Sequence, residues 1–245
     1  MSHTALLLLL VLAIVSPSLA RGYMYDYSVS TSCDCHKVAN GTCIHWTCSS
    51  DADSAYQCFW GGSTVELETG EKIPMSMLNV GDSVASLGSD GRIRYEKFHG
   101  WLDIDSDRFT TFVRLHVGYA TAITLTKDHL IFLVDYETGT DISGQTPVQP
   151  GDRVWLNENG LAVAVEITSI TYHELRGIYA PFTDSGTILV NDVLASNYAK
   201  VSSPHYLVHD VFLAPMKLLA GTPQKRGVHW YPALLNYLYT SFMSE

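Results

Sequence analysis

Short hydrophobic runs alternate with polar positions through the middle of the chain, and turn residues separate these runs. The runs that predict strands are residues 64–67, 83–87, 93–98, 109–116, 120–126 and 130–135. Turn signals such as Thr69-Gly70 and Asp90-Gly91 lie between them. Alternation with a period of two, broken by frequent turns, is typical of half-buried β-strands. The pattern therefore predicts an all-β domain from Thr64 onward.

One turn-and-strand unit occurs twice in this region. Residues 78–84 read LNVGDSV, and residues 148–154, seventy positions later, read VQPGDRV. In both copies a second turn follows and leads into another strand. Repetition of aligned turns and strands at nearly one offset indicates a duplicated unit. We therefore expect two β subdomains related by a pseudo-twofold axis.

The N-terminal end has the pattern of a secretory signal peptide. An apolar run is followed by the small-residue site Ser18-Leu19-Ala20, so we expect residues 1–20 to be removed and the mature chain to start at Arg21. An uncleaved anchor is the alternative, but the run is short for a membrane span and breaks at Pro17. Asn40-Gly41-Thr42 is a glycosylation acceptor, which fits a secreted chain.

The C-terminal end is rich in proline and aromatic residues. Leu234, Leu235, Leu238 and Phe242 fall on one helical face, which predicts a short amphipathic helix. This helix either packs on the β domain or faces a ligand.

The formal net charge of −10 excludes some partners. Nucleic acid and anionic lipid surfaces repel an acidic chain, so we expect neither as a partner. Any attachment to a membrane then requires apolar contact or a covalent lipid.

The five cysteines are unevenly placed, four within sixteen residues and one standing alone. In an oxidising compartment Cys33, Cys35, Cys43 and Cys48 are expected to form two disulfides, in any of three connectivities. A zinc site is the alternative, but the spacing lacks paired C-x2-C knuckles. Cys58 is left over, and an extra cysteine in a secreted protein is either an intermolecular link or a reactive group.

The segment around Cys58 resembles the start of a Hint domain, the autoprocessing module shared by inteins and hedgehog proteins. Gln57-Cys58-Phe59 stands at the junction, and Thr126-Lys127-Asp128-His129 matches the Thr-x-x-His motif of the hedgehog version. The resemblance continues through residues 177–183, 186–191, 195–196, 213–216 and 229–231, and so spans residues 58 to about 232. Residues 21–57 do not resemble the hedgehog signalling domain.

The resemblance implies a set of catalytic residues. Cys58 would attack the Gln57 carbonyl through a five-membered ring, with His129 as proton donor to the departing nitrogen and Thr126 as its partner or as a hydrogen bond to the scissile amide. Asp103, on a loop ahead of the next strand, would activate a sterol hydroxyl, helped by a pKa that burial raises. Taken singly, these residues also read as a buried cysteine, a strand threonine, a core histidine and a surface acid.

Two positions depart from the hedgehog pattern. Gln57 stands where the family has glycine, so a bulkier residue must enter a strained site. Asn197 stands where hedgehog domains often carry a second cysteine, which removes a possible disulfide partner for Cys58.

The predicted organisation is a signal peptide (1–20), a short Cys-rich segment (21–57), a Hint domain (58–201) and a sterol-recognition region (202–245). The predicted function is autocatalytic cleavage of the Gln57–Cys58 bond through a thioester, with transfer of the upstream peptide to a sterol or other lipid alcohol. We expect no cofactor and no metal, processing in the ER lumen, and secretion of a lipidated signalling peptide toward a cell-surface receptor. Cleavage by water, or an inactive Hint domain in a non-enzymatic secreted protein, are the alternatives.

Overall fold

In the computed structural model, the described residues are 29–39, 42–52, 58–88, 90–127, 129–134, 141–143, 148–197, 216–217, 226–231 and 234. In residues 29–39, 42–52 and 141–143 only the backbone is described. The predicted signal peptide, Asn40, Gln57 and most of the predicted C-terminal helix lie outside these residues. The four clustered cysteines lie in the strands described by backbone alone, so their predicted disulfides stay a prediction.

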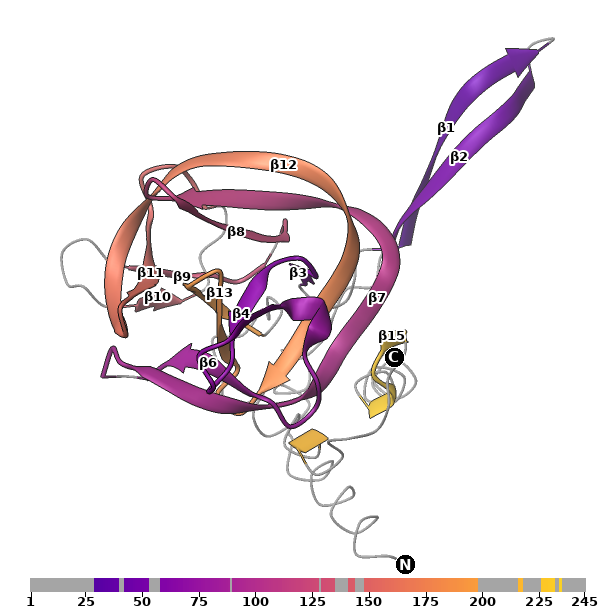
Figure 1. The fold of residues 1–245 in the computed structure, drawn as a ribbon. Helices are drawn as coiled ribbons and strands as arrows, with labels where there is room; N and C mark the ends of the chain where they lie inside the picture. Colours follow the sequence, from indigo (N-terminus) through magenta and orange to yellow (C-terminus); the bar gives the residue numbers. More distant parts are fainter. Residues whose placement is uncertain are drawn as a thin grey trace, which may run out of the picture.

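β-strands account for most of the described chain, which confirms the all-β class. The strands are β1 (Val29–Ala39), β2 (Thr42–Ala52), β3 (Phe59–Trp60), β4 (Thr64–Glu66), β5 (Lys72–Pro74), β6 (Ser83–Leu87), β7 (Ile93–Val117), β8 (Thr121–Thr126), β9 (Phe132–Val134), β10 (Asp141–Ser143), β11 (Arg153–Glu158), β12 (Leu161–Thr183), β13 (Thr187–Val190), β14 (Val193–Ser196) and β15 (Gly227–Val228). A 3-10 turn, Met75–Met77, follows β5. Strands β1 and β2 pair only with each other, and Figure 1 shows this hairpin standing apart from the main sheet.

Two long strands, β7 and β12, organise the main sheet. They have 25 and 23 residues and run antiparallel along most of their length. Register shifts, including the one at Gly177 and the one after Ala180, let the ribbon bend. Figure 1 shows the two strands curving together around the body, with β3, β4, β6 and β13 in their concave side. The sequence predicted two short strands within β7, so their continuity is a correction.

The predicted duplication is visible in the hydrogen bonds of the two Gly-Asp turns. In the first copy the Gly81 N–H donates to the Phe98 carbonyl at 2.9 Å, and the Phe98 N–H donates to the Asp82 carbonyl at 2.8 Å. The second copy makes the same two bonds, at 2.9 and 2.7 Å, with Gly151, Asp152 and Ile167. Both glycines have a φ of +99°, in the region that L side chains rarely adopt. The pseudo-twofold organisation is therefore confirmed at the level of single bonds.

The core divides into two main clusters. The larger cluster includes Phe59, Phe98, Ile123 and Ile167, all with no exposed surface. The second cluster contains Cys58 and is completed by side chains of β7, β12 and the C-terminal region, namely Leu102, Phe112, Ile178, Ala180, Phe182, Met216 and Tyr231. The cysteine is thus enclosed by segments from both halves of the chain and from its C-terminal part.

We expect Gly61→Ala to destabilise the protein by about 1–3 kcal/mol, because an added methyl group overpacks this site. A Cβ at Gly61 would lie 2.2 Å from Cε2 of Tyr179. That ring is buried and stacks edge-on against Trp101 with centroids 5.3 Å apart, so it has little freedom to move. Chemical denaturation measures the free energy of unfolding. Gly70→Ala, at a positive φ in open space, is the control and isolates backbone strain of about 1 kcal/mol; a Gly61 variant as stable as the parent would contradict the packing argument.

Candidate active site

Cys58 lies directly before β3, and the end of β8 holds its backbone on both sides. The Cys58 amide nitrogen, which is the nitrogen of the peptide bond from Gln57, donates to the Thr126 hydroxyl at 3.0 Å. The Thr126 N–H donates in turn to the Cys58 carbonyl at 2.9 Å. The Cys58 residue has no exposed surface. The structure therefore places the Thr126 hydroxyl on the amide nitrogen of Cys58, and the catalytic role of this contact stays a prediction.

His129 follows β8 within one tight turn, because its own N–H donates to the Thr126 carbonyl at 3.1 Å. Its ring packs against Phe59, with ring centroids 4.2 Å apart. Ring atom Nε2 lies 2.8 Å from the Ser196 carbonyl oxygen. A carbonyl oxygen only accepts hydrogen bonds, so Nε2 carries the proton and Nδ1 is the basic nitrogen of the neutral ring.

The surroundings of His129 keep its ring neutral. Burial lowers the pKa of the imidazole to about 4, and the backbone of Ser196 and of Cys58 oppose this shift only in part. Nδ1 is buried, and it has no hydrogen-bond partner within the described part of the chain. A neutral histidine with a lone pair on Nδ1 that accepts no hydrogen bond from the described residues is equipped to take up a proton near the Cys58 backbone and release it again.

The sequence predicted a loop around Asp103, but the structure places this residue in the interior of β7. Only 4% of its surface is exposed, so the alternative of a surface acid is wrong. Burial raises the pKa of this carboxyl to about 6, and Arg108, the main opposing charge, lowers it. The loop prediction failed because the polar residues of this segment pair with β12 on one side and with β15 on the other.

The strand register places Asp103 and Cys58 in one row across the sheet. Asp103 pairs with Ala180 on β12, and on the other side of β12 Tyr179 pairs with Phe59. Extending this register by one residue beyond β3 places Cys58 opposite Ala180, and the two side chains belong to the same buried cluster. Residues directly opposite one another share a face, and two strand spacings amount to about 10 Å. The small side chain of Ala180 is thus what stands between the thiol and the carboxylate.

Two contributors to this site carried no usable sequence signal. Ser196 acts through a backbone carbonyl, which any residue type supplies. Ala180 acts by being small, and an alanine in a strand is unremarkable. Among the described residues, no three histidine, cysteine or acidic side chains gather as a metal site, and no helix there has the length and apolar character of a membrane span.

Comparisons with known proteins agree with this geometry. The family profile of the Hint module matches residues 40–243. The Tiggy-winkle hedgehog protein of Danio rerio is 30% identical over 79% of this chain and 52% of that protein. Protein hedgehog of Drosophila virilis is 31% identical over 76% of this chain and 45% of that protein. The chain spans about half the length of the curated relatives it matches.

Solved inteins are also similar to this chain. The DnaB intein from Synechocystis sp. PCC 6803 is 13% identical, with a TM-score of 0.48 over 59% of this chain and 99% of the intein. The gp41-1 intein has 17% identity and a TM-score of 0.44, over 57% of this chain and 98% of that chain.

The fold and the site together are a duplicated β domain in which a Thr-x-x-His segment lies on the amide of a buried cysteine. The chain belongs to the Hint-module family, and within that family it is related to the hedgehog proteins.

The two perturbed groups predict opposite pH effects on stability. The folded-state pKa of Asp103 is raised to about 6, so its contribution is present below about pH 4 and is lost as the pH rises through 6. The folded-state pKa of His129 is lowered to about 4, so its contribution is present above about pH 6.5 and is lost as the pH falls through 4. The two effects overlap in the parent, and single variants separate them.

We expect Asp103→Asn to gain about 2–3 kcal/mol of stability relative to the parent as the pH rises from about 4 to above 6, because the variant avoids a buried carboxylate. Urea denaturation at several pH values measures this difference. His129→Gln serves as the comparison, and its stability relative to the parent should change in the opposite direction. A pH-independent difference between parent and Asp103→Asn would show that this carboxyl is solvated.

Proposed function

We propose that this chain cleaves its own Gln57–Cys58 bond through an internal thioester and transfers the upstream peptide to a sterol or another lipid alcohol. The hydrogen bond from the Cys58 amide to the Thr126 hydroxyl is the single observation that carries the proposal. Cleavage requires this amide nitrogen to become a leaving group, and the Thr126 hydroxyl lies where it can stabilise that nitrogen as it departs.

In the first step, the Cys58 thiol attacks the carbonyl carbon of Gln57. The thiol proton passes to Nδ1 of His129, and the same nitrogen then delivers a proton to the Cys58 amide nitrogen. The C–N bond breaks, a C–S bond forms, and Cys58 gains a free α-amino group. A histidine with a pKa near 4 is a strong acid once protonated, which suits it to drive the departure of the nitrogen.

In the second step, a lipid hydroxyl attacks the thioester carbonyl, and Asp103 accepts its proton. The C–S bond breaks, an ester forms, and the Cys58 sulfur leaves as a thiolate that takes up a proton. A buried carboxylate with a pKa near 6 is ionised at neutral pH yet more basic than an ordinary aspartate. The row of Cys58, Ala180 and Asp103 supports this assignment, because two strand spacings, about 10 Å, separate the carboxyl-bearing residue from the cysteine.

The acceptor is proposed to be a lipid alcohol because apolar side chains surround the thiol. The cluster around Cys58 includes Phe112, Phe182 and Tyr231. The exposed Trp230 comes two residues after β15, the strand that pairs with Asp103. We further propose that processing takes place in the ER lumen and that the lipid-tipped peptide of residues 21–57 is secreted as a signal for a cell-surface receptor. The expected signal sequence and the names of the hedgehog relatives support this localisation.

Mass spectrometry on the full chain tests the whole scheme, with and without cholesterol and with Cys58→Ala as the control. We expect a peptide that ends at Gln57 and carries a sterol, and no cleavage in the control. A peptide ending at Gln57 without an adduct would keep the thioester and replace the alcohol with water. An intact chain under every condition would support the inactive Hint domain.

Thr126→Val should slow thioester formation by about 100-fold, because it removes the oxygen that holds the leaving nitrogen without changing the size of the side chain. Dithiothreitol, which cleaves a thioester directly, reports this step alone. Thr126→Ser keeps the hydroxyl and should restore most of the rate. Equal rates for the valine and serine variants would remove Thr126 from the mechanism.

Asp103→Asn should separate the two steps. Cleavage by dithiothreitol is expected to stay within about twofold of the parent, while sterol transfer falls by about 100-fold for lack of a base. Asp107→Asn is the matched control, because Asp107 lies on the same strand but is about half exposed and pairs with Arg176. If Asp103→Asn impaired both steps equally, the carboxyl would act on the fold or on the first step instead.

A further inference from the structure

The Ser196–Asn197 peptide group stands between the catalytic histidine and a neighbouring turn. Its carbonyl oxygen, from Ser196, accepts the bond from Nε2 of His129 at 2.8 Å. Its N–H, from Asn197, donates to the Gly186 carbonyl at 2.8 Å. A peptide group is planar, so the orientation of its N–H also sets the direction of its carbonyl. Whatever fixes this plane also fixes the imidazole of His129.

The side chain of Asn197 anchors the plane from the other side. Its Nδ2 donates to the Thr183 hydroxyl at 2.7 Å, and that hydroxyl donates to the Thr187 carbonyl at 3.0 Å. Asn197 and Thr183 are 2% and 0% exposed. Oδ1 of Asn197 is buried without a hydrogen-bond partner among the described residues, which costs about 1–3 kcal/mol. An apolar residue at this position would avoid this cost. The hydrogen bond from Nδ2 to Thr183 is therefore the contact through which the side chain stabilises the peptide plane.

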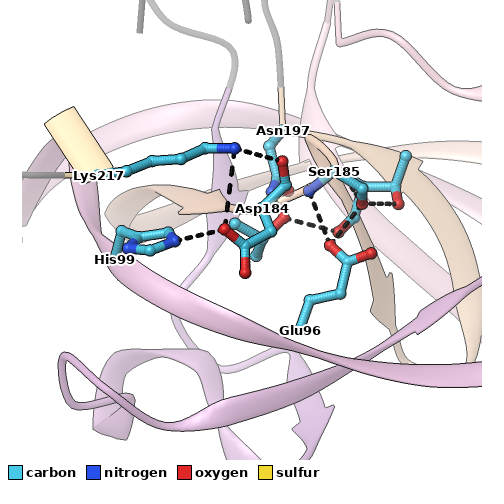
Figure 2. Close-up of polar contacts among 8 residues, drawn as sticks. Glu96, His99, Asp184, Ser185, Asn197 and Lys217 are labelled. Carbon is cyan, nitrogen blue, oxygen red and sulfur yellow. Dashed lines mark hydrogen bonds and ion pairs between the residues drawn. The ribbon is translucent and has the colours of Figure 1, made fainter. Parts of the chain in front are cut away.

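The turn that receives the Asn197 N–H is itself held in place, as Figure 2 shows. Nε2 of His99 lies 2.7 Å from Oδ1 of Asp184, and Nζ of Lys217 donates to the Asp184 carbonyl at 2.8 Å. The Ser185 N–H donates to Oε2 of Glu96 at 2.8 Å. Side chains of β7 and of the C-terminal region therefore fix the turn between β12 and β13. This turn holds the N–H of the Ser196–Asn197 peptide, and Thr183 holds the Asn197 side chain.

We propose that Asn197 is a positioning residue for His129. Through the Thr183 hydroxyl and the Ser196–Asn197 peptide, it holds the imidazole in the tautomer that has its proton on Nε2 and leaves Nδ1 open toward the Cys58 backbone. The catalytic consequence rests on the proposed self-cleavage, whereas the effect on the ring exists in any folded chain.

Thr183→Val tests this support with little change in side-chain volume. It leaves Nδ2 of Asn197 without an acceptor, so the peptide plane relaxes and the bond to Nε2 weakens. Both tautomers of His129 then become populated. Thr183→Ser retains the hydroxyl and is the matched rescue variant, and Asn197→Ala removes the anchor from the opposite side.

The first readout is the 15N NMR spectrum of histidine side chains in the uncleavable Cys58→Ala chain. The His129 signals are assigned by their loss in His129→Gln. In the Cys58→Ala chain we expect one tautomer with the proton on Nε2, in the Thr183→Val and Asn197→Ala variants a mixture, and in Thr183→Ser the parent pattern. A single unchanged tautomer in both disruptive variants, with the fold intact by circular dichroism, would overturn the proposal.

The second readout is the rate of dithiothreitol-induced cleavage in chains that keep Cys58. We expect Thr183→Val to be at least about tenfold slower than the parent and Thr183→Ser to recover the rate, as for other losses of aligned acid-base catalysis. A slowing that only matches the loss of folded protein would count against a positioning role. If the parent fails to cleave while the tautomer changes as expected, the proposed function fails and the positioning role of Asn197 stands.

Discussion

The antiparallel pairing of β7 with β12 is the constraint on which the rest of the structure depends. This ribbon carries Asp103 and Ala180 opposite each other, and Cys58, directly before β3, extends the same row. It also joins the two repeated subdomains, because each Gly-Asp turn is closed by one of the two strands. Residues that are far apart in the sequence meet because these two strands stay paired along their bends, through several register shifts. A shift of that register by one residue would move the acid to the other face of the sheet.

The polar groups of the site lie among apolar side chains, and this burial shifts their pKa values. His129 is kept neutral and Asp103 is made more basic by the same cause, the loss of water around them. The two pKa shifts run in opposite directions, which suits the proposed roles, in which His129 donates a proton in the first step and Asp103 accepts one in the second. The Cys58 N–H donates to the Thr126 hydroxyl, and Nε2 of His129 donates to the Ser196 carbonyl. These two bonds orient the threonine and the histidine beside the Cys58 amide.

Much of this arrangement could be predicted from the sequence, and the predictions that failed did so for physical reasons. Alternating hydrophobic positions and the repeated Gly-Asp turns predicted the β class and the duplication, since both depend on local chemistry. The motif residues Cys58, Thr126 and His129 were also predictable, because they are recognisable in type and spacing. The burial of Asp103 was not, because pairing with strands distant in sequence overrides the polar character of its segment. The part played by Asn197 was equally hidden, since its effect passes through a backbone plane.

The contacts that hold the Cys58 backbone have a consequence for the energetics of the proposed reaction. After the C–N bond breaks, the new amino group remains anchored beside Thr126 and cannot diffuse from the thioester. The amino group can therefore rapidly attack the thioester carbonyl and re-form the amide. The amide is the more stable of the two species. The yield then depends on a kinetic competition between reclosure and capture by the second nucleophile. Such a precursor would interconvert reversibly between amide and thioester, and the supply of the acceptor would decide when the upstream peptide is released.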